Sequence, residues 1–158
     1  MSNRIQIGLL IIAIPLVVFV FYLSRHELTL NKFFLFEPPV VHIDDVRLRV
    51  EVADSDVERE KGLSGRKEFG TKYNGLLFIF PDSDYHGIWM KDMYFPIDII
   101  WINDELVVTE ITKSVSPDSY PYIFRPKQPA KYLIETDIHI VDTMGIRVGQ
   151  KVKLPLDY

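Results

Sequence analysis

Residues 89–93 (WMKDM) place an ammonium group and a carboxylate among large apolar side chains. If Lys91 points into the domain, its charge needs a carboxylate partner, and Asp98, flanked by isoleucines, is the nearest candidate in the sequence. Proton-transfer and carbonyl-binding sites use a desolvated lysine or aspartate of this kind. The alternative is a structural ion pair that fixes the register of two strands. Both interpretations predict that Lys91 and Asp98 lie close together.

Further polar residues lie before this segment. The planar guanidinium group of Arg59 or Arg66 could bind Asp98 or an anionic ligand. The alternative is that Arg59 is a solvated residue of a helix surface and that Arg66 ties down a loop. His86 is the histidine best placed to act as an acid or base, because it lies in the loop that leads to residues 89–93.

The composition excludes several classes of function. The chain of 158 residues has no cysteine, and its 4 histidines lack the spacing of metal ligands, so we expect neither a disulfide nor a metal site. It has no G-x-S-x-G motif and no phosphate-binding glycine loop, and we expect no cofactor. The net charge of -4 and the absence of a Lys/Arg cluster argue against nucleic-acid binding.

The first 26 residues are predicted to be a membrane anchor. The run from Ile7 to Leu23 has no charge and reaches the lower end of the roughly 17–25 residues that cross a bilayer. Bulky residues such as Phe21 and Tyr22 occupy the place where signal cleavage needs small ones, so we expect the anchor to be retained. Residues 27–39 form a juxtamembrane linker, and residues 40–158 form one domain, which we place on the extracytoplasmic side.

Short apolar segments separated by turns are typical of a mainly β domain. Alternation predicts a strand in the second half of residues 41–53, after a turn at Asp44-Asp45. Further strands are expected at residues 76–80, 88–93, 97–102, 106–113, 130–136 and 152–154, with a turn at 81–84 and a long proline-rich loop at 114–129. We expect both tryptophans, Trp89 and Trp101, in the core; the alternative is a platform on which a sugar stacks.

Two short helical pieces complete the prediction. Ser55 followed by Glu58 matches a capping box, so a helix is expected at residues 56–61, ending at Gly62 in a left-handed conformation. Asp137 is expected to cap one helical turn that ends at Gly145. The fold class is therefore mainly β (α+β): a small closed or nearly closed barrel of about seven strands with two short helices, preceded by one transmembrane helix.

The motifs in this chain resemble those of the DUF192 family of unknown function, also called UPF0127. The resemblance covers about Val46 to Leu154. It rests on Arg59, Gly62-Leu63, Arg66, Gly75-Leu76-Leu77-Phe78, Phe80, Trp89-Met90-Lys91, Pro96-Ile97-Asp98-Ile99-Ile100, Leu133-Ile134-Glu135, Gly145-Ile146 and Val148-Gly149. The resemblance implies a small β-rich barrel behind an N-terminal signal or anchor and brings no established activity. The family usually has asparagine and threonine where this chain has Asp92 and Met93.

These observations together favour a membrane-anchored binding module over an enzyme. The candidate site residues are Arg59, Arg66, Trp89, Lys91, Asp98 and Glu135, with His86 and Asp92 as weaker candidates. An envelope protein or a small molecule would be the ligand. One alternative is a small enzyme that uses Lys91 or His86 with Asp98 on a carbonyl-bearing substrate. Another is a structural accessory subunit of a membrane complex, which would show an exposed apolar patch.

Overall fold

The computed structural model describes residues 37–155, and those from Pro38 onward belong to one compact unit. Its seven-stranded sheet has the order β5-β4-β6-β3-β2-β1-β7. The strands are β1 (Val40–Ile43), β2 (Val46–Ala53), β3 (Gly75–Asp84), β4 (Ile97–Ile102), β5 (Val108–Val115), β6 (Ala130–Asp137) and β7 (Val152–Lys153). The helices of this part of the chain are α2 (Asp56–Lys61), α3 (Ile140–Met144) and the 3-10 turn η1 (Pro117–Ser119).

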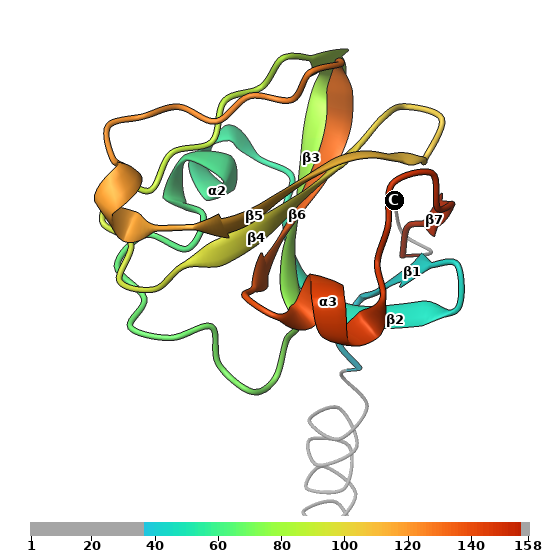
Figure 1. Cartoon of the computed structure of the whole chain (residues 1–158), viewed down its shortest axis with the longest axis horizontal. Coiled ribbons are helices and arrows are strands. Elements are labelled where there is room, and N and C mark those ends of the chain that lie inside the picture. The colour runs from blue at the N-terminus through green and yellow to red at the C-terminus, as the bar shows by residue number, and fades with distance from the viewer. Residues whose placement is uncertain (1–36, 156–158) are drawn as a thin grey trace, which may run out of the picture. The chain divides into compact units, whose positions relative to one another are not determined.

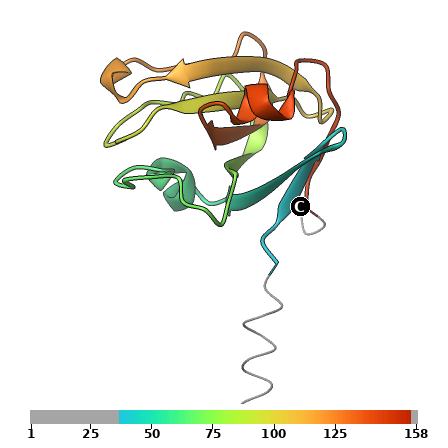
Figure 2. The ribbon, with the colours of Figure 1, turned by 60° about the horizontal axis from the view of Figure 1, so that its bottom comes forward.

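The sheet curls into a half-barrel (Figure 1, Figure 2). All neighbouring strands are antiparallel except β2 and β3, which are parallel. At one end the two edges of the sheet meet, where Val108 N donates to Gln150 O (3.0 Å) and Val152 N donates to Leu106 O (2.8 Å). The predicted mainly β class with short helices is confirmed, whereas the predicted barrel is closed only in part.

The side chains of the sheet form two apolar clusters, one on each face. Along β4, Ile97, Ile99 and Trp101 belong to the first cluster, and Ile100 and Ile102 belong to the second. Leu63, which follows α2, belongs to the cluster on the first face, and Val141 of α3 belongs to the cluster on the second. Because both faces are covered, every residue of β4 is buried, Asp98 included.

Helix α2 begins and ends where the sequence predicts. The Ser55 hydroxyl accepts a hydrogen bond from Glu58 N (3.3 Å), and the Glu58 carboxylate accepts one from Ser55 N (3.1 Å), which completes the capping box. Gly62 ends the helix with φ 45° and ψ -131°, a conformation that favours glycine but differs from the predicted left-handed helical one. The next residue, Leu63, is buried against the first face, so this cap fixes the helix to the sheet.

Two strand predictions are wrong. Residues 88–93 form no strand: Ile88 exchanges two backbone hydrogen bonds with Phe124, and the chain then turns at Asp92, whose φ is 56°. The turn predicted at residues 81–84 is instead part of β3, which continues to Asp84 beyond a bulge. Pro81 is compatible with this strand because it is exposed and follows the regular pairing with β6, so no ladder bond needs its missing N–H.

The second helix begins later than predicted. Asp137 is the last residue of β6 and does not cap α3, whose N-cap is His139 at φ 78° without a side-chain hydrogen bond. The predicted end is confirmed, since Gly145 has the left-handed conformation at φ 69°.

The predicted membrane anchor, from Ile7 to Leu23, lies outside the described residues. Among residues 37–155, no helix has the length and apolar character needed to cross a membrane.

Candidate functional site

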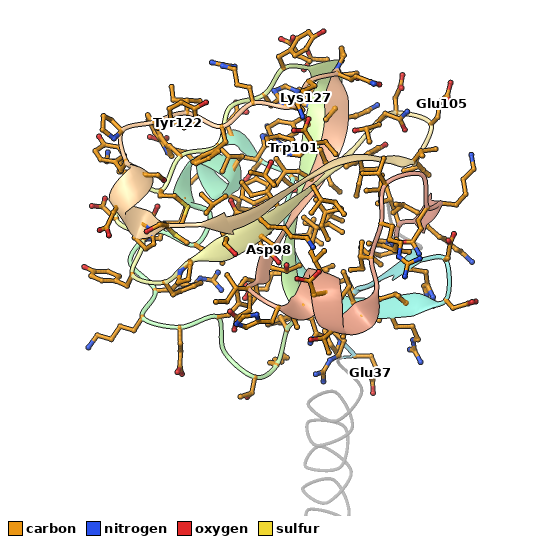
Figure 3. All side chains as sticks on the ribbon, in the orientation of Figure 1. Glu37, Asp98, Trp101, Glu105, Tyr122 and Lys127 are labelled. Carbon is orange, nitrogen blue, oxygen red and sulfur yellow. The ribbon has the colours of Figure 1, made fainter. Side chains whose placement is uncertain are left out.

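Lys91 and Asp98 lie apart. Lys91 is exposed, with its Nζ 5.9 Å from the centroid of the Trp89 ring. Asp98 is 2% exposed and lies on β4 (Figure 3), where its carboxylate accepts a hydrogen bond from Ser114 N (2.7 Å). The predicted proximity of the two charges is wrong because residues 89–93 form a surface loop rather than a strand beside Asp98.

Glu135 is a buried carboxyl in the middle of the sheet. It lies on β6 directly between Leu76 of β3 and Ile99 of β4, and it is 5% exposed. Within the described residues, no group donates a hydrogen bond to its side chain. Burial raises the pKa of Glu135 to about 8, although the nearby Arg66 guanidinium acts in the opposite direction. Glu135 therefore keeps its proton at neutral pH.

Arg66 and Glu51 form the charged neighbourhood of Glu135. The Arg66 guanidinium donates to both oxygens of the Glu51 carboxylate, at 2.6 and 2.8 Å. These bonds to Glu51 raise the pKa of Arg66. Glu51, Leu76 and Glu135 are cross-strand neighbours, so their side chains share the first face of the sheet. The single positive charge of Arg66 therefore lies near two carboxyl groups. It balances the negative charge of Glu51, so the three groups have no net charge only while Glu135 is protonated.

A small cavity, which we call the inner cavity, opens beside Glu135. Its volume is about 50 Å³, and its walls come from α2, the residues after it, the loop at 87–93 and the sheet. Apolar side chains of Leu63, Phe78, Ile88, Met93 and Ile97 line part of it, and Arg59, Glu60, Lys61 and Ser64 line another part with Glu135. Such a volume admits one or two water molecules or a ligand group of similar size. Glu135 therefore borders a space that has both apolar and charged walls.

A wider hollow of about 310 Å³, which we call the outer groove, adjoins the inner cavity. It is lined by Val57, Glu60, Lys61, Ser64, Trp89, Lys91 and Asp92, of which Glu60, Lys61, Ser64 and Trp89 also line the inner cavity. Trp89 is 46% exposed at this rim and contacts Tyr120 edge-on, with ring centroids 6.3 Å apart. The prediction that Trp89 is a core residue is wrong, whereas Trp101 is fully buried as predicted.

Hydrogen bonds between two loops hold the rim together. The Ser64 hydroxyl donates to Lys91 O, and Gly65 N donates to Asp92 O, both at 2.8 Å. The positive φ of Asp92 turns the chain at this point. The segment after α2 therefore fixes the loop that presents Trp89 and Lys91, so the walls of the groove are positioned by backbone contacts.

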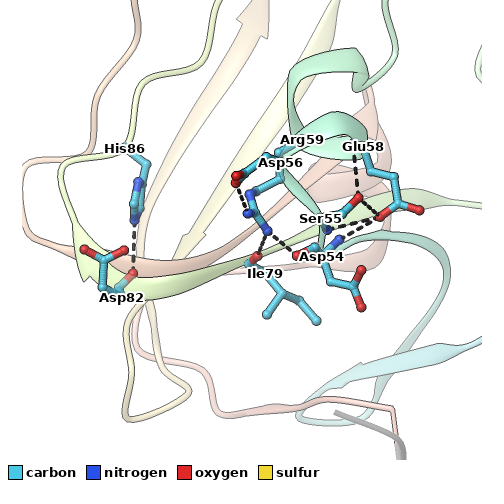
Figure 4. Close-up of polar contacts among 8 residues, drawn as sticks. All are labelled: Asp54, Ser55, Asp56, Glu58, Arg59, Ile79, Asp82 and His86. Carbon is cyan, nitrogen blue, oxygen red and sulfur yellow. Dashed lines mark hydrogen bonds and ion pairs between the residues drawn. The ribbon is translucent and has the colours of Figure 1, made fainter.

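Arg59 is a structural tie that also lines the inner cavity. Its guanidinium donates to Ile79 O (2.7 Å), to Asp54 O and to the Asp56 carboxylate (2.5 Å), which joins α2 to β3 (Figure 4). Most of its donors are therefore used within the domain.

His86 stacks on Phe80 with ring centroids 3.7 Å apart, and its Nε2 lies 3.0 Å from Asp82 O (Figure 4). His86 lines neither the inner cavity nor the outer groove.

Replacing Lys91 by methionine is expected to change the free energy of unfolding by less than about 0.5 kcal/mol. The ammonium group is solvent-exposed and makes no ion pair among the described residues. Its removal therefore leaves no buried charge without a partner. Urea denaturation of the two proteins checks this. A loss of several kcal/mol would mean that Lys91 neutralises a buried carboxylate after all.

Residues 39–154 match the model of the family described as "DUF192: Uncharacterized ACR, COG1430". The chain belongs to the DUF192 family. A UPF0127 protein of Pyrococcus furiosus is 29% identical over 114 residues, which cover 69% of this chain and 89% of that protein. A UPF0127 protein of Pyrococcus abyssi is 30% identical over 110 residues, which cover 66% and 85%.

Two solved structures resemble this DUF192 domain. One is from Sinorhizobium meliloti 1021 and is described as a proposed transcription regulator, with a TM-score of 0.68, 26% identity and coverage of 73% of this chain and 92% of that one. The other is a protein of unknown function from Novosphingobium aromaticivorans, with a TM-score of 0.65, 27% identity and coverage of 73% and 83%.

The structure gathers most of the candidate residues in one place. Arg59, Trp89, Lys91, Glu135 and Asp92 line the inner cavity or the outer groove, and Arg66 acts on Glu135 from the side of Glu51. Asp98 and His86 lie elsewhere. Glu60, Lys61 and Ser64 were not predicted as site residues, because a capping box locates a helix but does not indicate which nearby polar residues will border a cavity.

Proposed function

We propose that this DUF192 domain is a ligand-binding module, held at a membrane through the run from Ile7 to Leu23 and placed on the extracytoplasmic side. The observation that supports binding is the combination of the outer groove with the inner cavity. Binding sites are typically concave and mainly apolar, with a few polar groups that orient the ligand. Here apolar side chains such as Leu63 and Phe78 line the inner cavity beside an unbonded carboxyl, and Trp89 is exposed at the entrance.

The geometry does not favour the enzyme that combines Lys91 or His86 with Asp98. Asp98 faces the cluster that includes Val141, whereas Lys91 lies on the outer groove. A general acid or base must lie within hydrogen-bond reach of the reacting group, directly or through one water molecule. No single substrate position satisfies this for Lys91 and Asp98.

A role in transcription, suggested by the description of the Sinorhizobium protein, is not part of this proposal. The net charge of -4 provides no electrostatic attraction for a nucleic-acid backbone. We therefore expect the partner to be a small molecule or an envelope protein.

An interaction surface of a membrane complex is the second candidate. The loop between η1 and β6 exposes Tyr120, Ile123 and Tyr122, the last of which is labelled in Figure 3. Tyr120 contacts Trp89 at the rim of the groove. Exposed aromatic side chains are enriched at protein interfaces. If this surface is the functional one, replacing Tyr122 by serine will abolish assembly with the partner while leaving the groove intact.

Ligand-observed NMR screening against cell-envelope metabolites tests the binding proposal. Compounds that bind wild-type protein are expected to bind Trp89→Ala at least about tenfold more weakly, because truncation removes one wall of both hollows. Tyr94→Ala is the matched control, since Tyr94 is an exposed aromatic residue that lines neither hollow. Equal binding to wild-type protein and Trp89→Ala, or no binding compound in the screen, would contradict the proposal.

A further inference from the structure

The carboxyl of Glu135 lacks a hydrogen-bond partner within the described residues. It is 5% exposed, and its cross-strand neighbours are Leu76 and Ile99. The inner cavity beside it is lined by apolar side chains together with Arg59, Glu60, Lys61 and Ser64. Buried polar side chains are nearly always hydrogen-bonded, so an unbonded carboxyl at the edge of a cavity indicates that something else completes it.

The charges around the cavity leave Glu135 without a cation of its own. Arg66 is bound through both of its terminal nitrogens to Glu51. Arg59, on α2, is bound to Asp56 and to two backbone carbonyls. The other charged residues that line the two hollows are Glu60 and Lys61 of α2 and Lys91 and Asp92 of the opposite loop, and none of them forms an ion pair with Glu135.

We propose that the inner cavity binds the primary ammonium group of a ligand, with Glu135 as its carboxylate partner and the rest of the ligand in the outer groove. This inference rests on the proposed binding function. The cavity volume of about 50 Å³ suits an ammonium group with the carbon that bears it. Arg66 balances the charge of Glu51, and an ammonium group would balance the charge of ionised Glu135. At the rim, Trp89 already has one ammonium, that of Lys91, near its ring.

The proposal fixes the sign of the pH dependence. Burial raises the pKa of Glu135 to about 8, so the carboxylate that an ammonium group needs is scarce at pH 6 and dominant at pH 9. The apparent affinity for an amine is therefore expected to rise by up to about 90-fold between these pH values. A neutral amide that accepts a hydrogen bond from the protonated carboxyl would show the opposite trend, because its donor disappears above pH 8.

Titrations of the full-length chain in detergent with n-butylammonium chloride test the proposal, with the methionine methyl groups observed by NMR. The Met93 methyl resonance, inside the cavity, is expected to shift, whereas that of Met144 on α3 is not. In Glu135→Gln the affinity at pH 9 is expected to fall at least about tenfold and to lose its pH dependence. Glu105→Gln, in the exposed turn between β4 and β5 (Figure 3), is the matched control and should behave as wild type.

Further probes separate the outcomes. O-phosphoethanolamine and alanyl-alanine represent the two sources of an ammonium group, a lipid headgroup and a peptide, and tighter binding of either one supports the proposal and assigns the source. Butyramide is the neutral probe. Binding of butyramide without binding of any amine overturns the ammonium inference and leaves the binding function standing. Binding of n-butylammonium to Glu135→Gln as tightly as to wild type also overturns it. Failure of the binding function itself would appear separately, in the metabolite screen.

Discussion

Raising the pH from about 4.5 to about 8 is expected to lower the stability of the folded domain by roughly 4–5 kcal/mol through Glu135 alone. In the unfolded chain this carboxyl loses its proton near its ordinary pKa of 4.5, whereas in the fold burial keeps the proton on until about pH 8. Between these two pKa values Glu135 is ionised in the unfolded chain and protonated in the fold, so its ionisation favours the unfolded state. The contribution of Glu135 to the free energy of unfolding is fully present below pH 4.5 and is lost as the pH rises through 8. Above that pH, Glu135 causes no further change in the free energy of unfolding.

The difference between wild type and Glu135→Gln isolates this effect. Glutamine has nearly the shape of protonated glutamate and cannot ionise, so the variant is expected to match wild type near pH 4.5 and to be several kcal/mol more stable at pH 9. Urea denaturation from pH 4.5 to pH 9 measures the difference, with Glu105→Gln as the exposed control. Parallel stability curves for wild type and Glu135→Gln would mean that Glu135 is ionised in the fold at neutral pH.

The elements that could be predicted from the sequence are those with strong local determinants. Helix α2 has a capping box at Ser55 and Glu58 and a glycine at Gly62, and its bounds agree with the prediction. Strand β4 was predicted from its apolar run, which Asp98 alone interrupts, and has the expected bounds, 97–102. In both cases the residues that decide the structure lie within a few positions of each other.

The arrangement around Lys91 could not be predicted, because distant residues determine it. Ile88 pairs with Phe124, and the carbonyls of Lys91 and Asp92 accept from Ser64 and Gly65, so the segment is held by contacts across the chain. A strand that is apolar at nearly every position also gives no indication of which face each residue occupies. The sequence therefore shows that Asp98 lies among isoleucines, but it does not show that Asp98 faces the side of the sheet opposite to Glu135.

Glu135 was a candidate through family resemblance, and its partners were not foreseen. Alternation along β2 places Glu51 with Arg47 and Arg49 on a solvent-facing side. In the structure the segment after α2 covers that end of the strand, and Arg66 reaches Glu51. A loop that folds over one end of a strand changes the environment of a single residue without changing the alternation that is visible in the sequence.

Replacing Asp98 by alanine is expected to lower the free energy of unfolding by about 2 kcal/mol, whereas replacing it by asparagine is expected to cost less than about 1 kcal/mol. The Asp98 carboxylate accepts from Ser114 N, and Ser114 has φ 53°, a conformation that needs such support in a residue other than glycine. Alanine removes the acceptor. Asparagine keeps an oxygen for Ser114 N, and its amide nitrogen can donate to the hydroxyl of Thr136, a buried group without a hydrogen-bond partner directly opposite in register.

Urea denaturation of the two Asp98 variants, alone and combined with Lys91→Met, separates a backbone role from an ion-pair role. If Asp98 supports the backbone at Ser114, the effects of Asp98→Ala and Lys91→Met should add to within about 0.5 kcal/mol, because the two side chains share no contact. If Asp98 were held by a distant positive charge, asparagine would be about as harmful as alanine, and the double variant would depart from additivity. Equal losses in Asp98→Asn and Asp98→Ala would therefore contradict the hydrogen-bond account, since the two residues differ in their ability to accept from Ser114 N.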